Sequence, residues 1–323
     1  MVGTKAEILQ RKALRALRWA TGFAAALCLL SCSPESAPTP PAAETPDAEE
    51  RRDPLTLLFG VYTTDTPTEA VKKFRPLLDV LERDLSEALE EPVRIRTNVY
   101  GDYASGLEAV VSGKVDFARL GPASYVLASR RSDDVELLAM ETRKGQKTFY
   151  GVLCVHEDSE LESIEEVAGQ RVAFGDENST IGRYLSQQLL HERGVHAEDL
   201  TGFEYLGRHD LVGHAVGMGK FDVGALKEST FRKLVEQGIR IRELARFPNV
   251  TKPWVATGRL DPEIRNEVRE ALLGIRDPDA LARVGKTPFA SASLGDYEPI
   301  RRSLEDNHLF FGSEEKNGGG VTP

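Results

Sequence analysis

Apolar residues recur along this chain at two spacings, one typical of strands and the other of helices. Residues 55–61 form a short, mostly apolar run of strand length. After it, apolar residues follow at steps of three and four positions, as on one face of a helix: Val71, Phe74, Leu78, Leu81, Leu85 and Leu89. Alternate positions of 93–99 are then apolar or β-branched, which favours a second strand. The pattern therefore predicts a strand, a helix and a strand in succession.

The same order continues through the rest of the chain. Strand-like runs are expected at residues 117–120, 150–155, 171–174 and 203–206, and helical segments at 107–111, 182–192 and 210–218. Alternating strands and helices predict an α/β fold with parallel sheets covered by helices on both faces. Ligands of such sheets bind where strands end, so three strand-to-helix junctions are candidate sites: 60–65, 120–125 and 172–180.

The first 31 residues differ from the rest in pattern and in charge. A basic stretch precedes the apolar run 19–30, an order typical of a secretory signal. This run is shorter than the ~20 apolar residues that a permanent membrane-spanning helix needs. It ends in Leu29-Leu30-Ser31-Cys32, which resembles a bacterial lipobox, where cleavage leaves the cysteine as a lipid-bearing N-terminus. We therefore predict a lipoprotein signal peptide at 1–31 and lipid attachment at Cys32, with an uncleaved anchor as the alternative.

Two further segments look unstructured. Residues 32–53 are rich in proline, alanine and acidic residues and contain no apolar side chain of core size, which predicts a disordered tether. The glycine-rich end, 312–323, predicts a flexible tail. Cys154 is then the one cysteine left in the folded body, because Cys28 would leave with the signal and Cys32 would carry lipid. It lies in an apolar run, so we predict a core residue and no disulfide.

The charge of the chain restricts its partners. The whole chain carries 51 acidic and 41 basic residues, a formal charge of −10. Five basic residues and one acidic residue give the signal a charge of +4, so the remainder carries −14. A surface this acidic disfavours binding to nucleic acid, because phosphate backbones attract basic surfaces. We therefore expect no nucleic-acid partner.

The junction at 172–180 carries the most informative chemistry. Its helix would begin at Asn178-Ser179-Thr180, where hydroxyl groups and unpaired backbone N–H groups can bind an oxyanion. Asparagine, serine and threonine are also the ordinary N-cap residues of helices. The local pattern therefore leaves both an anion site and a purely structural helix start open.

Taken in order, several segments resemble the phosphate/phosphite/phosphonate-binding proteins that serve bacterial ABC importers. The matching segments are 59–62, 74–78, 102–104, 113–125, 150–152, 172–180, 207–210, 221–225 and 253–256. The resemblance covers about residues 54–300. It implies the two-lobed type II periplasmic binding protein fold, in which each lobe is a mostly parallel sheet covered by helices and the chain makes two hinge crossings.

This resemblance also implies a domain division. The first lobe would comprise residues 54–148 plus 254–311, and the second lobe residues 149–253. The crossings would lie near 148–150 and 252–255. The ligand would occupy the cleft between the lobes.

The resemblance assigns an oxyanion loop. The Ser-Thr-Ser-Gly loop of the family falls on Ser179, Thr180, Ile181 and Gly182. There, hydroxyl and backbone N–H groups would hold the oxygens of the ligand. Ile181 departs from the family pattern, since it keeps a backbone donor but has no hydroxyl.

Further ligand contacts are implied on other segments. The binding tyrosines of the family match Tyr103 and Tyr150, whose hydroxyl groups can donate hydrogen bonds. The Gly-Ser-His-Asp motif of the family matches 207–210, which assigns His209 to a ligand oxygen, with Arg208 in place of serine. Members that bind aminoalkyl phosphonates use acidic groups for the amine, and Glu228 is the candidate counterpart. Segment 247–254 has no acid where such members place one, which disfavours an amine-bearing ligand.

Two other kinds of site, a metal site and a hydrolytic active site, find little support in the sequence. The pairs His191/His196 and His209/His214 are spaced by five residues, which does not place two imidazoles on one helical face. We therefore predict no metal and no cofactor. An enzyme on the same fold could use Ser179, His209 and Asp210, but Ser179 lacks the Gly-x-Ser-x-Gly context of a serine nucleophile.

These observations together predict an extracytoplasmic solute-binding lipoprotein and not an enzyme. It would capture a small phosphorus oxyanion, such as phosphate, phosphite or a phosphonate, and deliver it to the permease of an ABC importer. We expect a monomer on the periplasmic side of a bacterial membrane, held by its lipid anchor. A sensory module that presents the ligand to a membrane receptor is the alternative.

Overall fold

The computed structural model describes residues 53–63 and 66–312. The predicted signal peptide 1–31, the lipid attachment at Cys32, and nearly all of the tether 32–53 and the tail 312–323 lie outside these residues. Within the described ranges, no helix combines the length and the apolar content that crossing a membrane requires.

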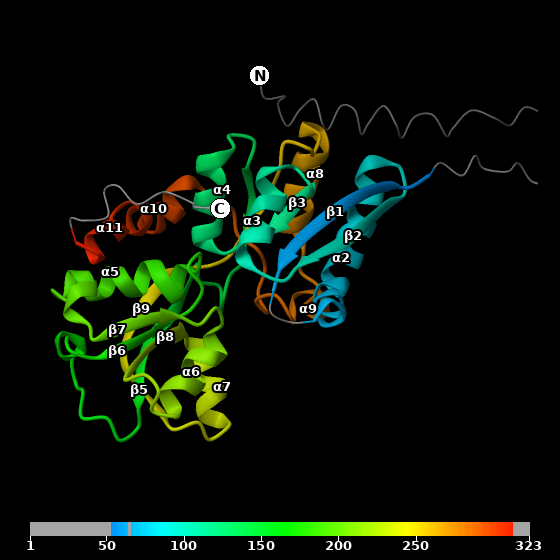
Figure 1. Ribbon diagram of the computed structural model, residues 1–323. Coiled ribbons are helices and arrows are strands. Elements are labelled where there is room, and N and C mark those ends of the chain that lie inside the picture. Colours follow the sequence, from blue (N-terminus) through cyan, green and yellow to red (C-terminus); the bar gives the residue numbers. More distant parts are fainter. Residues whose placement is uncertain (1–52, 64–65, 313–323) are drawn as a thin grey trace, which may run out of the picture. The chain divides into compact units, whose positions relative to one another are not determined.

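The first sheet has the strand order β2-β1-β3-β10-β4 (Figure 1). Strand β1 pairs in parallel with β2 and β3, whereas β10 runs antiparallel to β3 and β4. The bounds of these strands are β1 Leu55–Tyr62, β2 Val93–Tyr100, β3 Phe117–Arg119, β4 Glu136–Met140 and β10 Pro253–Ala256. The helices joined to them are α2 Pro67–Leu89, α3 Tyr103–Val111, α4 Pro122–Arg131, α8 Pro262–Gly274 and α9 Pro278–Leu281.

The second sheet has the strand order β7-β6-β8-β5-β9. Strand β6 pairs in parallel with β7 and β8, whereas β5 runs antiparallel to β8 and β9. These strands are β5 Thr148–His156, β6 Arg171–Phe174, β7 Gly202–Tyr205, β8 Val223–Lys227 and β9 Ile241–Val250. The remaining helices are a π-helical turn Thr180–Tyr184, α5 Leu185–Glu192, α6 His209–Gly217, α7 Glu228–Glu236, α10 Glu298–Glu305 and α11 Asn307–Phe310. Short 3₁₀ turns span Glu165–Val167, Ala197–Asp199 and Leu294–Tyr297.

The predicted α/β fold with two mostly parallel sheets is confirmed, because four of the five strands in each sheet run in the same direction, while β10 in the first sheet and β5 in the second run against them. Each sheet has two parallel and two antiparallel pairings. The reason is the path of the chain. A strand that enters a lobe from the hinge starts at the edge where the parallel strands end, so β5 and β10 run in the opposite direction. The first crossing lies between β4 and β5, at 141–147, just before the predicted position, and the second is Thr251-Lys252.

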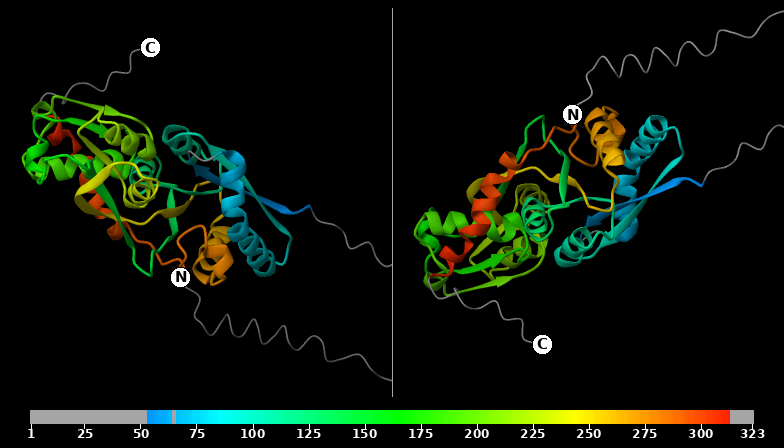
Figure 2. Two further views of the ribbon diagram at one scale, coloured as in Figure 1. Left: turned by 90° about the horizontal axis from the view of Figure 1, so that it is seen from below. Right: turned by 90° about the horizontal axis from the view of Figure 1, so that it is seen from above.

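Local sequence explains why α2 starts where it does. Thr66 and Glu69 form a capping box, in which the backbone N–H of Glu69 donates to Thr66 Oγ1 (3.3 Å) and that of Thr66 to Glu69 Oε2 (3.1 Å). Pro67 then occupies the first helical position, where its missing N–H costs nothing. The apolar face of α2 packs against α8, and the two helices lie side by side in both views of Figure 2.

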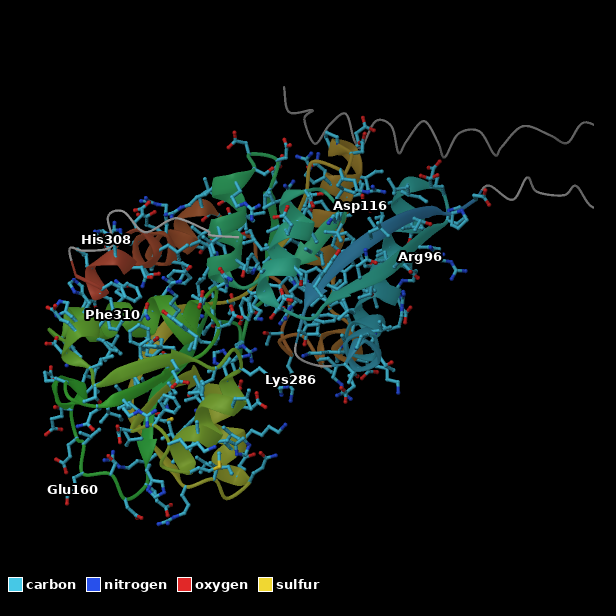
Figure 3. All side chains as sticks on the ribbon, in the orientation of Figure 1. Arg96, Asp116, Glu160, Lys286, His308 and Phe310 are labelled. Carbon is cyan, nitrogen blue, oxygen red and sulfur yellow. The ribbon has the colours of Figure 1, made fainter. Side chains whose placement is uncertain are left out.

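Aromatic side chains fix the two cores. In the first sheet, Trp254 of β10 stacks on Phe59 of β1 with ring centroids 4.9 Å apart. In the second, Phe174 of β6 meets Phe310 of α11 edge to face at 5.9 Å. Figure 3 labels Phe310 where α11 approaches α5. Phe310 of α11 is thus buried among the apolar side chains of the second core. The predicted domain division, with 254–311 in the first lobe, stays a prediction.

Candidate functional site

A cavity with a volume of 510 Å³ lies where strand ends and loops of the two sheets face each other. One wall comes from the ends of β1 and β2 and the start of α3. The other wall comes from the start of α6 and from the body of α7. Lys252 of the second crossing also lines the cavity. The residues that line the cavity include Tyr62, Asp102, Tyr103, Arg208, His209, Asp210, Lys233 and Lys252.

Tyr103 stands at this cavity because α3 begins there. The side chain of Asp102 caps the helix by accepting a hydrogen bond from the N–H of Ser105 (2.7 Å), which places Tyr103 at the first helical position. Its hydroxyl group is hydrogen-bonded to Ser179 on the opposite lobe. Burial raises the pKa of Tyr103, so the phenol stays protonated and can act as a donor.

A second tyrosine, Tyr62 at the end of β1, was not among the predicted ligand contacts. Its ring lies 4.5 Å from that of Tyr103, centroid to centroid. Its hydroxyl accepts a hydrogen bond from the N–H of Gly121 (2.7 Å) and is 3.0 Å from Ser124 Oγ. Burial is the main cause that raises the pKa of Tyr62. The sequence could have indicated Tyr62, because this residue lies in the candidate junction 60–65. No residue of that junction was assigned to the ligand.

The three predicted loop residues are all buried in one place. Ser179 Oγ accepts a hydrogen bond from the N–H of Gly182 (3.0 Å) and so caps the π-helical turn. Thr180 Oγ1 accepts one from the N–H of Ala123 (2.9 Å), at the start of α4 on the other lobe. Ile181 packs in the second core. This loop therefore links the lobes through Thr180, while Ile181 contributes only its backbone.

His209, as predicted, lies at the cavity, at the first position of α6. Its Nδ1 atom is buried and, within the described residues, has no hydrogen-bond partner. Burial, reinforced by nearby Lys227 and Lys252, lowers the pKa of His209 from 6.5 to about 4, so the imidazole is neutral at physiological pH. The ring is also hydrogen-bonded to the backbone of Ala225. A neutral imidazole with an unpartnered nitrogen beside a cavity is a candidate ligand contact.

Positive charge gathers beside His209, and the sequence reasoning missed it. Burial, reinforced first by Arg143 and Arg119, lowers the pKa of Lys227, at the end of β8, to about 7. Burial, reinforced by Arg119 and Lys227, holds the pKa of Lys252 well below its ordinary value. The available signals were a lysine that ends an apolar strand and a lysine directly before Pro253 in the crossing segment.

One buried carboxylate compensates part of this charge. Both oxygens of Glu141 accept hydrogen bonds from the guanidinium of Arg119, with 3.1 Å between Glu141 Oε2 and Arg119 Nη2. Trp254 Nε1 donates to the same carboxylate at 3.4 Å. Burial alone would raise the pKa of Glu141, but the charge and hydrogen bonds of Arg119 outweigh it and lower this pKa, so the carboxylate stays ionised.

Two predicted residues are not brought to the cavity. The side chain of Tyr150 is 38% exposed and its ring lies 5.5 Å from the guanidinium carbon of Arg246. Glu228 forms ion pairs with Arg232 (2.7 Å) and with Arg246 (2.9 Å). Neither residue lines the 510 Å³ cavity. The carboxylate of Glu228 is thus engaged by two arginines instead of facing a ligand amine.

The geometry also bears on the residues proposed for an enzyme. In the part of the chain that the structure describes, Ser179 Oγ has no hydrogen bond to His209, and Asp210 pairs with Arg208 at 2.7 Å. A serine nucleophile needs a base within hydrogen-bonding reach. Among residues 53–63 and 66–312 there is also no group of three or more side chains suited to a metal ion.

Three comparisons relate these features to known proteins. The model of the family described as "ABC transporter, phosphonate, periplasmic substrate-binding protein" matches residues 59–297. The probable ABC transporter phosphite binding protein PhnD1 of Prochlorococcus marinus is 28% identical over 222 residues, which are 65% of this chain and 72% of that protein. The phosphate-import protein PhnD of Mycolicibacterium smegmatis is 25% identical over 197 residues, 57% of this chain and 59% of that protein.

A solved structure shares the fold. PhnD1 from Prochlorococcus marinus, in complex with methylphosphonate, superposes with a TM-score of 0.66 at 21% identity. The superposition covers 80% of this chain and 100% of that chain. The two-lobed architecture predicted from the sequence is therefore the architecture of this chain.

Proposed function

Because this chain belongs to the family of periplasmic substrate-binding proteins that serve phosphonate ABC transporters, we propose that its cleft captures a small phosphorus oxyanion. Members of this family bind a solute and pass it to a transporter, so the chain is a binding protein and not an enzyme, as its sequence indicated. Its place of action is the periplasm. Phosphate, phosphite and phosphonates are the proposed ligands, and the permease of an ABC importer is the proposed receiver.

The observation that carries this proposal is the unpartnered Nδ1 atom of His209. A buried polar atom without a partner costs roughly 1–3 kcal/mol, and a ligand oxygen can remove that cost. Tyr103 lines the same cavity from the opposite wall. A protonated ligand oxygen could donate to His209, while a charged oxygen would receive a hydrogen bond from Tyr103.

The oxyanion loop supplies the remaining donors in this proposal. The first N–H groups of a helix have no partner inside the helix, which makes those of Thr180 and Ile181 available to an anion. The hydroxyl group of Thr180 already accepts a hydrogen bond and still has a proton to donate to the ligand, whereas the proton of Ser179 serves its contact with Tyr103. Their contacts to Tyr103 and Ala123 join the two lobes. Ligand capture would therefore be coupled to closure of the cleft.

We further propose that the chain is a monomeric lipoprotein. Cleavage before Cys32 would leave a lipid-bearing cysteine, and the proline-rich segment that follows would let the lobes reach the permease. Two or three acyl chains, each CH₂ contributing ~0.8 kcal/mol when buried, hold a protein at a membrane surface.

A thermal-shift panel tests the proposed ligand class. The probes are phosphate, phosphite, hypophosphite, methylphosphonate, 2-aminoethylphosphonate, sulfate and selenite. A ligand at 100 times its dissociation constant stabilises the fold by ~2.7 kcal/mol, which raises the melting temperature measurably. We expect a shift with at least one phosphorus oxyanion and a smaller shift, or none, with sulfate and selenite. Absence of any shift with the phosphorus compounds at millimolar concentration would refute the proposed ligand class.

A further inference from the structure

Two partly buried lysines lie beside the cleft on segments that are distant in sequence from the oxyanion loop. Lys252 belongs to the second crossing and lines the cavity, with its Nζ atom 5.9 Å from the ring centroid of Tyr62. Lys227 ends β8, with its Nζ atom 5.4 Å from the ring centroid of Phe149. Both are close enough to His209 to lower its pKa, which places the two ammonium groups on the His209 side of the cleft.

These lysines lack a local counter-charge. Within the described residues, no carboxylate oxygen lies within 4.0 Å of either ammonium nitrogen. The groups that act on them most strongly are Arg119, Arg143, Lys73 and Glu141, and Glu141 is already paired with Arg119. Like charges at short range repel one another, and the penalty grows as water is excluded. The positive charge around Lys227 and Lys252 therefore exceeds the negative charge of the side chains near them.

The acidic residues of the cavity wall do not balance the positive charge around Lys227 and Lys252 either. Asp102 caps α3 through the N–H of Ser105, and Asp210 pairs with Arg208. Another lysine, Lys233 of α7, lines the same cavity. Each carboxylate on the wall thus has a local partner, whereas lysine ammonium groups remain for a ligand.

The size of the cavity also favours a ligand larger than a simple oxyanion. A water molecule has a share of about 30 Å³ in the liquid, so a cavity of 510 Å³ has room for far more than a five-atom oxyanion. A larger ligand can place one group beside Tyr103 and His209 and another at Lys252, since all three residues line this cavity.

Resting on the proposed function, we infer that the ligand is a phosphonate whose organic substituent carries a second acid group, which Lys252 and Lys227 bind. A carboxylate and a second phosphonate share this chemistry. The two lysines act as specificity residues, because each forms an ion pair only with the doubly acidic ligand. They also select against amine-bearing phosphonates by charge repulsion.

Isothermal titration of the mature chain tests this inference with four probes: methylphosphonate, phosphonoacetate, methylenediphosphonate and 2-aminoethylphosphonate. We expect phosphonoacetate or methylenediphosphonate to bind at least about tenfold more tightly than methylphosphonate, a difference of about 1.4 kcal/mol. Whichever of the two binds more tightly identifies the second acid group. The amine-bearing probe should bind more weakly than methylphosphonate.

Single-residue variants test whether these two lysines, and not the overall charge of the protein, determine the preference for a doubly acidic ligand. Lys252→Met should remove the preference for the doubly acidic probe and change methylphosphonate affinity less than about threefold, since methionine keeps the packing of the lysine stem. Lys227→Met should act in the same direction and serves as a second variant should the first fail to fold. Lys220→Met, an exposed lysine of the same lobe, is the matched control and should keep the preference.

The outcomes are distinguishable from failure of the proposed function. If methylphosphonate binds as tightly as both doubly acidic probes, the inference is overturned while the oxyanion site stands. The same holds if Lys252→Met weakens all probes equally. If no phosphorus compound binds at all, the proposed function itself fails.

Discussion

The neutral state of His209 makes a prediction about stability that can be worked from the structure. Burial next to two lysines lowers its pKa from 6.5 to about 4 in the folded chain, whereas the unfolded chain keeps the ordinary value. Between these two values the unfolded state binds more protons, so the free energy of unfolding falls as the pH falls from 6.5 toward 4. One pKa unit corresponds to about 1.4 kcal/mol, so this residue alone should account for about 2 kcal/mol between about pH 7 and about pH 4.5.

The assay is urea unfolding of the ligand-free chain at these two pH values, followed by tryptophan fluorescence and circular dichroism. Many groups titrate in this range, so the informative quantity is a difference between variants. His209→Gln removes the titration and should reduce the loss of stability between the two pH values by about 2 kcal/mol. His308→Gln, at an exposed position on α11 labelled in Figure 3, is the control and should leave the loss close to that of the wild type.

Two results would refute the reasoning. An equal pH dependence in the wild type and in His209→Gln would mean that His209 titrates in the folded chain much as in the unfolded one. A greater loss in His209→Gln would mean that protonated His209 stabilises the fold, which contradicts its burial beside Lys227 and Lys252.

Three further predictions concern the lobes, the anchor and the last helix. Thr180→Val leaves the buried N–H of Ala123 without an acceptor and should weaken phosphonate binding by about 1–3 kcal/mol in calorimetry, whereas exposed Thr68→Val should not. Mass spectrometry of membrane-extracted protein should find an acylated Cys32 as the N-terminus; an intact signal segment would contradict the lipobox. Phe310→Ala should cost about 3–5 kcal/mol in urea unfolding, whereas Leu309→Ala, 40% exposed on the same helix, should cost far less; equal losses would mean that α11 is not anchored in the second core.

The local elements of the fold could be predicted from the sequence because they depend on local patterns. The strand expected at 171–174 is β6, Arg171–Phe174, and the strand expected at 93–99 is β2, Val93–Tyr100. The helix predicted from its apolar spacing starts a little earlier than its first apolar residue, since the capping box at Thr66 sets its beginning. Hydrophobic spacing and capping residues act over a few positions, so these features need no knowledge of distant contacts.

The candidate site was predictable only in part. His209, Tyr103 and Ser179 follow strand ends in segments that resemble a known family, and the structure brings these residues together at or beside the cleft. Tyr150 and Glu228 lie on segments with the same resemblance, yet their side chains meet Arg246 on another surface. A match in sequence gives the position of a residue in the chain, whereas the direction of its side chain depends on neighbours in space.

The sequence by itself determined the alternation of strands and helices, the basic and apolar leader pattern, and the residue types at the strand ends. Only the tertiary structure decided that the sheets are mixed, because the direction of β5 and β10 depends on where the chain crosses between the lobes. It also decided that Lys227 and Lys252 both lie near His209. Their charges are ordinary in sequence, but burial lowers the pKa of both side chains, because the charged form of an amine is costly to bury without a carboxylate beside it.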